Sequence, residues 1–340
     1  MDPLNIRTLF LALSTKKPPT GMLPPDDFTT YSLLRFVDSV LRGIGQVMLQ
    51  NNSYTGLIFL AGIFYNSIIL GCAALLGGIA STAMAMLLGA ERSSVNAGLF
   101  GFNGVLVGIA ILYFLEPNIL TWGYVIIAAA CSTVIMSALL NLLSTWSIPA
   151  LTAPFVITTL LFILACARLG RLQTTDILPT AGLPSTATVE GVVTRSTLIE
   201  GLFNGVAQVF FQGSLVTGVF FVVGLLVSSR LACSAALIGS FIGMLVAWGM
   251  GADEVAIRSG AFGFNSVLTA IVFAGLIVAN MASVTYSALA VITTAVVFAA
   301  MSAALELLGM PALTSPFVLV VWLFLLASPQ FKNLKKAEPQ

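Results

Sequence analysis

A duplicated pattern constrains this chain more than any other feature of its sequence. Residues 148–155 read IPALTAPF, and residues 310–317 read MPALTSPF, which is the same pattern 162 residues later. The segment GLFGFNGVL at residues 98–106 returns at the same offset as GAFGFNSVL at residues 260–268. One constant offset over such a distance indicates an internally duplicated chain, in which each motif occurs twice in one architecture.

The composition places this duplicated chain in a membrane. Only 8% of its residues are charged, against about 25% in soluble domains. Nearly uncharged runs cover residues 54–88, 119–143, 216–248 and 284–305, and each is near or above the roughly 20 residues that cross a bilayer as a helix. The sequence therefore predicts an all-α, multi-pass integral membrane protein.

The same composition excludes several functional classes. The chain has no histidine and a net charge of +1. Histidine-based metal sites, catalytic triads and proton relays are therefore absent, and no basic tract suggests nucleic acid as a partner. We expect no metal, no cofactor and no enzymatic activity.

The order of segments predicts two membrane repeats. We expect an N-terminal tail (1–33), a first repeat (34–170), a polar connector (171–195), a second repeat (196–330) and a C-terminal tail (331–340). About five spans in each half give about ten transmembrane helices, with short broken or re-entrant helices. An odd number of spans inverts the second half relative to the first, whereas an even number would make the repeats parallel. Lysines in both tails favour cytoplasmic termini.

The proline motif predicts a helix break at membrane depth. Pro149 and Pro154 each remove a backbone donor, and a broken backbone is tolerated there only where protein or water receives its polar groups. Thr152 and its copy Thr314 could cap the helices that follow. Alternatively, in inverted repeats the two hydroxyls could face each other and line a central pore.

Amides and charges near the spans allow structural and functional interpretations. Asn103 and Asn265 could clamp adjacent helices by hydrogen bonds, and Gln50 and Gln212 could do the same. Gln46 and Gln208 are better candidates for a pore entrance. The carboxylates favour ion pairs near the helix ends, while Glu306 has no evident partner. Because no mid-span carboxylate recurs in both copies, a proton or sodium relay is disfavoured.

Together, the paired proline breaks and the paired Gly-Phe-Asn segments resemble the urea transporter family over nearly all of residues 34–330. The short tails are similar to those of bacterial members. This resemblance implies a passive urea channel in the plasma membrane, with a complete pore in each subunit of a homotrimer surrounded by lipid.

The resemblance also implies where urea binds. Two aromatic slots would hold urea flat, and two threonines would line the constriction between them. The implied pore-lining residues are Gln46, Leu49, Phe102, Leu106, Thr152, Gln208, Phe211, Phe264, Leu268 and Thr314. Two of them depart from the usual pattern, because Leu49 replaces a phenylalanine and Gln208 replaces a glutamate found in some relatives.

Two alternatives stay open at this point. A channel for ammonia, short amides or water would share this architecture and differ only in its slots. An ion-coupled secondary transporter would use Glu306 or Asp38.

Overall fold

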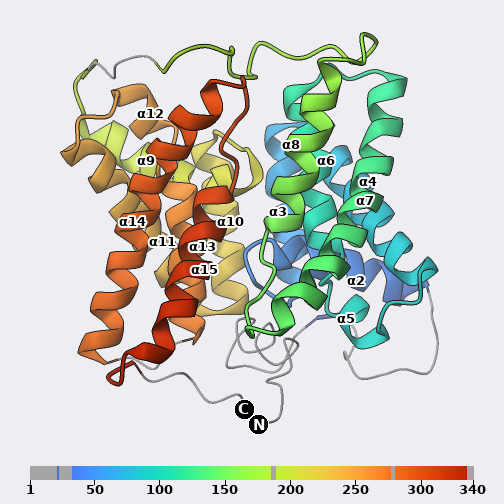
Figure 1. The fold of residues 1–340 in the computed structure, drawn as a ribbon, viewed down its shortest axis with the longest axis horizontal. Coiled ribbons are helices and arrows are strands. Elements are labelled where there is room, and N and C mark those ends of the chain that lie inside the picture. Colours follow the sequence, from blue (N-terminus) through green and yellow to red (C-terminus); the bar gives the residue numbers. More distant parts are fainter. Residues whose placement is uncertain (1–20, 23–32, 185–188, 277–279, 335–340) are drawn as a thin grey trace. The chain divides into compact units, whose positions relative to one another are not determined.

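The computed structural model of the chain describes residues 21–22, 33–184, 189–276 and 280–334. Helices dominate these residues, and they form two compact units that divide between Pro179 and Thr180 (Figure 1). The limits predicted above for the repeats, connector and tails stay predictions.

The first unit is built around one buried helix, α6 (Gly101–Phe114), which packs against α2, α4, α7 and α8. Glycine permits its closest contact, because a Cβ atom on Gly77 would lie 2.1 Å from the carbonyl oxygen of Gly104. The other helices of this unit are α2 (Leu33–Gln46), α3 (Ser53–Asn66), α4 (Ile68–Leu87), α5 (Arg92–Asn96), α7 (Ile119–Ser144) and α8 (Ala153–Cys166).

The second unit repeats these helices in the same order, and its core helix is α13 (Gly263–Leu276). Five of its helices have the bounds of their counterparts shifted by 162 residues, α13 among them. The remaining elements are α9 (Arg195–Ala207), η1 (Gln208–Phe210), α10 (Leu215–Ser228), α11 (Arg230–Gly249), α12 (Glu254–Arg258), α14 (Met281–Glu306), α15 (Ser315–Ala327) and η2 (Ser328–Gln330).

Long apolar helices support the predicted membrane location. Among the described residues, four helices are long and apolar enough to cross a bilayer, namely α4, α7, α11 and α14. A fifth candidate is the pair formed by residues 195–210 and α10, which bends by 73°. The all-α membrane class is thus supported, whereas the count of ten spans and the inversion of the repeats stay predictions.

Local capping explains where several helices start. Between α3 and α4 the chain breaks at Ser67, which is extended and accepts a hydrogen bond from the N–H of Leu70. Ser229 caps α11 in the same way. Serine favours such positions because its hydroxyl satisfies a free N–H of the first turn. The short helices α5 and α12 were not predicted.

Candidate functional site

The Gly-Phe-Asn motif and the proline break meet in each unit through one hydrogen bond. Asn103, on the core helix α6, accepts at Oδ1 from the N–H of Phe155 at 3.0 Å. In the second unit Asn265 accepts from the N–H of Phe317 at 3.2 Å. Both asparagines are buried. The structural interpretation of these asparagines is therefore correct, since each fixes the start of the helix that follows the break.

This bond leaves no capping role for the threonine hydroxyl. Thr152 occupies the position before α8, yet its side chain makes no capping hydrogen bond. The N–H of Ala153 donates to the carbonyl of Ala150 at 3.1 Å, Pro154 has no N–H, and Phe155 is bound by the asparagine. Thr314 stands in the same relation to α15, again without a capping bond. Of the two interpretations of these threonines, the one as helix caps is therefore not supported, and pore lining stays a prediction.

Four bulky residues of the motifs adopt the left-handed backbone conformation. Leu151 and Leu313, within the two breaks, have φ values of 52° and 51°. Leu49 and Phe211, after the opening helices, have φ values of 62° and 60°. This region is uncommon for residues with a large side chain, and strained residues cluster at functional sites. Both pairs coincide with segments that the sequence marks as candidates for the permeation path.

The glutamines at the ends of the opening helices differ between the units. Gln46 is buried and donates from Nε2 to the carbonyl of Ala97 at 3.0 Å. Gln208 is half-buried. Gln50 and Gln212 both bond to their own turns, because their amide nitrogens donate to the carbonyls of residues 48 and 210.

The remaining predicted lining residues lie on the two core helices. Leu106 and Leu268 are fully buried. Phe102 is 1% exposed, whereas Phe264 is half-buried and meets the ring of Phe298 edge-on, with centroids 5.6 Å apart. Each core helix packs against both neighbours that carry predicted residues: α6 against α2 and α8, and α13 against η1 and α15. Within each unit, the elements that contain or adjoin that unit's predicted pore-lining residues therefore pack against its core helix.

Comparison with known proteins assigns this arrangement to a family. The urea transporter family model matches residues 37–329, a range that includes both breaks and both Gly-Phe-Asn segments. The chain belongs to the urea transporter family. It is 32% identical over 308 residues to Urea transporter 1 of Ovis aries, covering 89% of this chain and 80% of the relative. Urea transporter 1 of Rattus norvegicus is 32% identical over 310 residues, covering 89% of this chain and 79% of the relative. Because the family consists of transporters, the prediction of no enzymatic activity is confirmed.

The charged residues form a different network in each of the two units. In the first unit Arg42 and Asp38 form a buried ion pair at 2.6 Å, and Arg42 also donates to Asn51 Oδ1 at 2.8 Å. A buried pair like this is costly to break from one side, because the other charge then stays buried without compensation. The predicted interpretation of these charges as ion pairs is correct.

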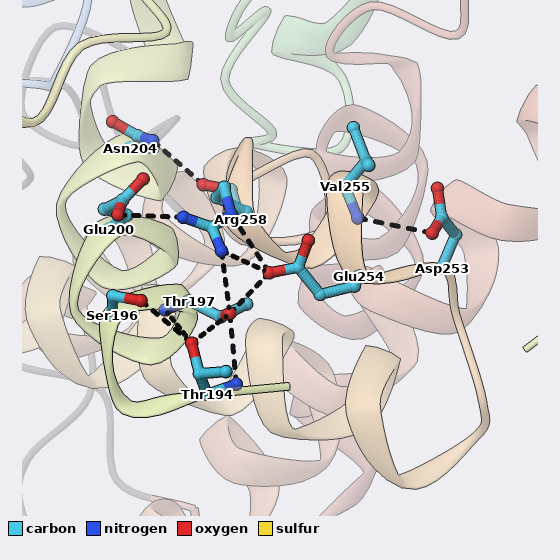
Figure 2. Close-up of polar contacts among 9 residues, drawn as sticks. All are labelled: Thr194, Ser196, Thr197, Glu200, Asn204, Asp253, Glu254, Val255 and Arg258. Carbon is cyan, nitrogen blue, oxygen red and sulfur yellow. Dashed lines mark hydrogen bonds and ion pairs between the residues drawn. The ribbon is translucent and has the colours of Figure 1, made fainter. Parts of the chain in front are cut away.

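In the second unit the arginine sits on another helix. Arg258, on α12, bridges Glu200 at 2.9 Å and Glu254 at 2.7 Å, as Figure 2 shows. The position equivalent to Arg42 is Asn204, whose amide donates to the carbonyl of Arg258 at 2.9 Å. The position equivalent to Arg258 is in turn an asparagine, Asn96. Arginine and asparagine have thus exchanged places between the repeats.

Glu254 and Arg258 lie on α12, outside the candidate spans, and their ion pair responds to acid. Hydrogen bonds from Arg258, followed by one from Thr197, hold the pKa of Glu254 below its ordinary value near 4.5. A carboxylate with a lowered folded pKa stabilises the fold above its unfolded pKa, and this stability is lost as pH falls through the folded pKa.

We expect the melting temperature of the wild type to fall from about pH 4.5 downward by about 1–3 °C more than that of Glu254→Gln, since partly exposed pairs contribute little. Thermal melts in detergent between pH 7 and pH 3 measure this difference. Glu306→Gln, which changes a carboxylate that forms no ion pair among the described residues, should follow the wild-type curve. Equal acid sensitivity of the wild type and Glu254→Gln would contradict the assignment.

Proposed function

We propose that this protein is a channel-like facilitator that lets urea permeate the membrane passively, down its gradient, through a pore in each subunit. The observation that carries the proposal is the family match over residues 37–329, together with the 32% identity to proteins named Urea transporter 1. The match spans both copies of the duplicated motifs, so both halves of the predicted pore belong to the recognised region.

The proposed pore arises from two inverted halves with about ten spans. In this arrangement the two proline breaks meet near mid-membrane, with Thr152 and Thr314 at the constriction. Leu106 and Leu268 form its walls, and Phe102, Phe264, Phe211 and Leu49 lie toward its two ends. Gln46 and Gln208 stand at the entrances. The matched left-handed conformations of the two breaks support a pore built from equivalent halves.

The chemistry of these groups suits urea. Urea carries four N–H donors and one carbonyl, so a series of hydroxyl and amide oxygens can replace its water step by step. Aromatic faces favour a flat solute, and an ion would lose far more solvation than such a lining returns. Because the threonines do not cap their helices, their hydroxyls are compatible with this role.

Ion-coupled transport receives less support. Asp38 is buried in its pair with Arg42, and Glu200 is paired with Arg258. A carboxylate held by arginine is a poor proton or sodium carrier, since releasing its partner would leave a charge without compensation. Other small neutral solutes stay the main alternative, because only the details of the slots separate them from urea.

The assembly and location follow from the same proposal. We expect a homotrimer surrounded by lipid in the plasma membrane, with both termini cytoplasmic. Crosslinking of the purified protein in detergent tests the trimer independently of transport.

Stopped-flow permeability of the purified protein in liposomes tests the function. We expect urea flux well above that of protein-free liposomes and faster than flux of formamide or water through the same protein. Flux that is no faster for urea than for those solutes would favour the general channel. Flux that requires a proton or sodium gradient would favour a coupled transporter.

A further inference from the structure

One aromatic ring of the second unit keeps an accessible face on a buried helix. From Gly263 to Phe273, every residue of the core helix α13 is buried except Phe264, which is half-buried. The equivalent ring in the first unit, Phe102 on α6, is only 1% exposed. Because an aromatic face stacks favourably on a flat group, the exposed part of Phe264 is suited to contact with a planar solute.

A second ring, on the neighbouring helix α14, contacts Phe264 edge-on. The centroid of Phe298 lies 5.6 Å from that of Phe264, with an angle of 81° between the ring planes. Phe298 also meets Phe262 edge-on, at 5.2 Å and 80°. Edge-on pairs at such separations are attractive beyond their buried area. Phe298 therefore holds two rings of the Gly-Phe-Asn segment at once.

The residue at this position has different partners in the two units. The first unit has Met136 in place of Phe298. Met136 is fully buried, and its sulfur accepts from Nδ2 of Asn103 at 3.7 Å. In the second unit Nδ2 of Asn265 donates instead to the carbonyl of Leu313 at 3.1 Å. This position on the helix thus contacts an amide in the first unit and aromatic rings in the second.

We propose that Phe298 is a positioning residue that makes the second repeat select flat solutes, because it fixes the orientation of the Phe264 ring. The inference rests on the proposed function, in which Phe264 lines the path of urea, and it assigns a role to a residue outside the predicted lining. A phenylalanine ring turns about two side-chain bonds, and the edge-on contact restricts that turning. A fixed ring favours a planar solute such as urea, whereas a ring that turns also admits solutes that are not flat.

Substitutions at Phe298 test the role through solute selection. Phe298→Met introduces the residue that the first unit has at the equivalent position. The measurement is the ratio of urea flux to the flux of ethylene glycol, a small neutral solute that is not flat, in proteoliposomes. We expect this ratio to fall about two- to tenfold, in keeping with the loss of edge-on ring contacts. Phe298→Leu should lower the ratio in the same way, even if Phe298→Met does not assemble, and Phe298→Tyr, which keeps the ring, should retain the wild-type ratio.

A matched control lies on α11. Phe241 is 46% exposed and forms no ring contact among the described residues, so Phe241→Met should keep both the wild-type flux ratio and the wild-type melting temperature. A purely structural role of Phe298 would lower the melting temperature of Phe298→Met and leave the flux ratio unchanged. That result would overturn the inference.

Fluorine NMR gives a readout that does not depend on transport. With 4-fluorophenylalanine incorporated at position 264, we expect the fluorine resonance to shift in Phe298→Met and to stay in place in Phe241→Met, because only the first substitution removes the neighbouring ring. An unshifted resonance in Phe298→Met would overturn the positioning role. Absence of urea flux in the wild type would instead count against the proposed function, and the resonance would still show whether Phe298 holds Phe264.

Discussion

Replacing Thr152 and Thr314 together with valine should lower urea flux about ten- to hundredfold while the protein assembles normally. Valine keeps the shape of threonine and removes the hydroxyl. Each lost hydrogen bond in the constriction costs about 0.5–1.5 kcal/mol, and two such losses raise the barrier to passage accordingly. Since neither hydroxyl caps its helix, the helices after the breaks should form as before. Stopped-flow urea permeability and size-exclusion profiles measure the two outcomes.

A control for this pair lies on α8, the helix that follows Thr152. Thr159 is fully buried on α8, and its hydroxyl has no partner among the described residues. Its equivalent in the second repeat is already a valine, Val321. Thr159→Val should therefore leave flux near the wild-type value. Wild-type flux in the double variant would remove the two threonines from the permeation path.

Asn103→Leu should destabilise the first unit by about 1–3 kcal/mol, because the buried N–H of Phe155 loses its acceptor. Asn265→Leu should have a similar effect on the second unit through Phe317. We expect lower melting temperatures in detergent and faster amide exchange at the start of α8 or α15, respectively. Urea flux should fall as well, since the start of each helix carries a proposed constriction residue.

The exposed Asn141 on α7 provides the comparison for these variants. Asn141→Leu removes an amide of the same size without orphaning a buried donor, so its melting temperature should stay close to that of the wild type. If Asn103→Leu behaved like Asn141→Leu, the bond to Phe155 would not anchor the break.

Much of this architecture could be predicted from the residues. The asparagines indicated hydrogen bonds between helices because an amide in an apolar span must find a partner, and Asn103 does so. The prolines indicated the breaks because each one removes a backbone donor, and α8 begins beside Pro154. The sequence around Thr152 could not show whether its hydroxyl caps α8 or lines the pore. The capping role depended on which group bonds to the N–H of Phe155, and that acceptor comes from 52 residues earlier in the chain.

Other features have no sequence signal of their own. Leucine is not a residue that favours positive φ, so the left-handed turns at Leu49 and Leu151 could not be read from its propensity. The start of α4, in contrast, does follow a local signal, because the hydroxyl of Ser67 accepts a hydrogen bond from the N–H of Leu70.

The exchange of arginine and asparagine between the repeats limits how this protein can be re-engineered. A symmetrised version built from two copies of one half would have to carry over Asp38, Arg42 and Asn96 as a set, or Glu200, Asn204 and Arg258 as a set. Swapping one member alone would leave either two arginines competing for the same carboxylate or a carboxylate with no cation. The two halves are therefore not interchangeable, and any recombination between them must keep the members of each set together.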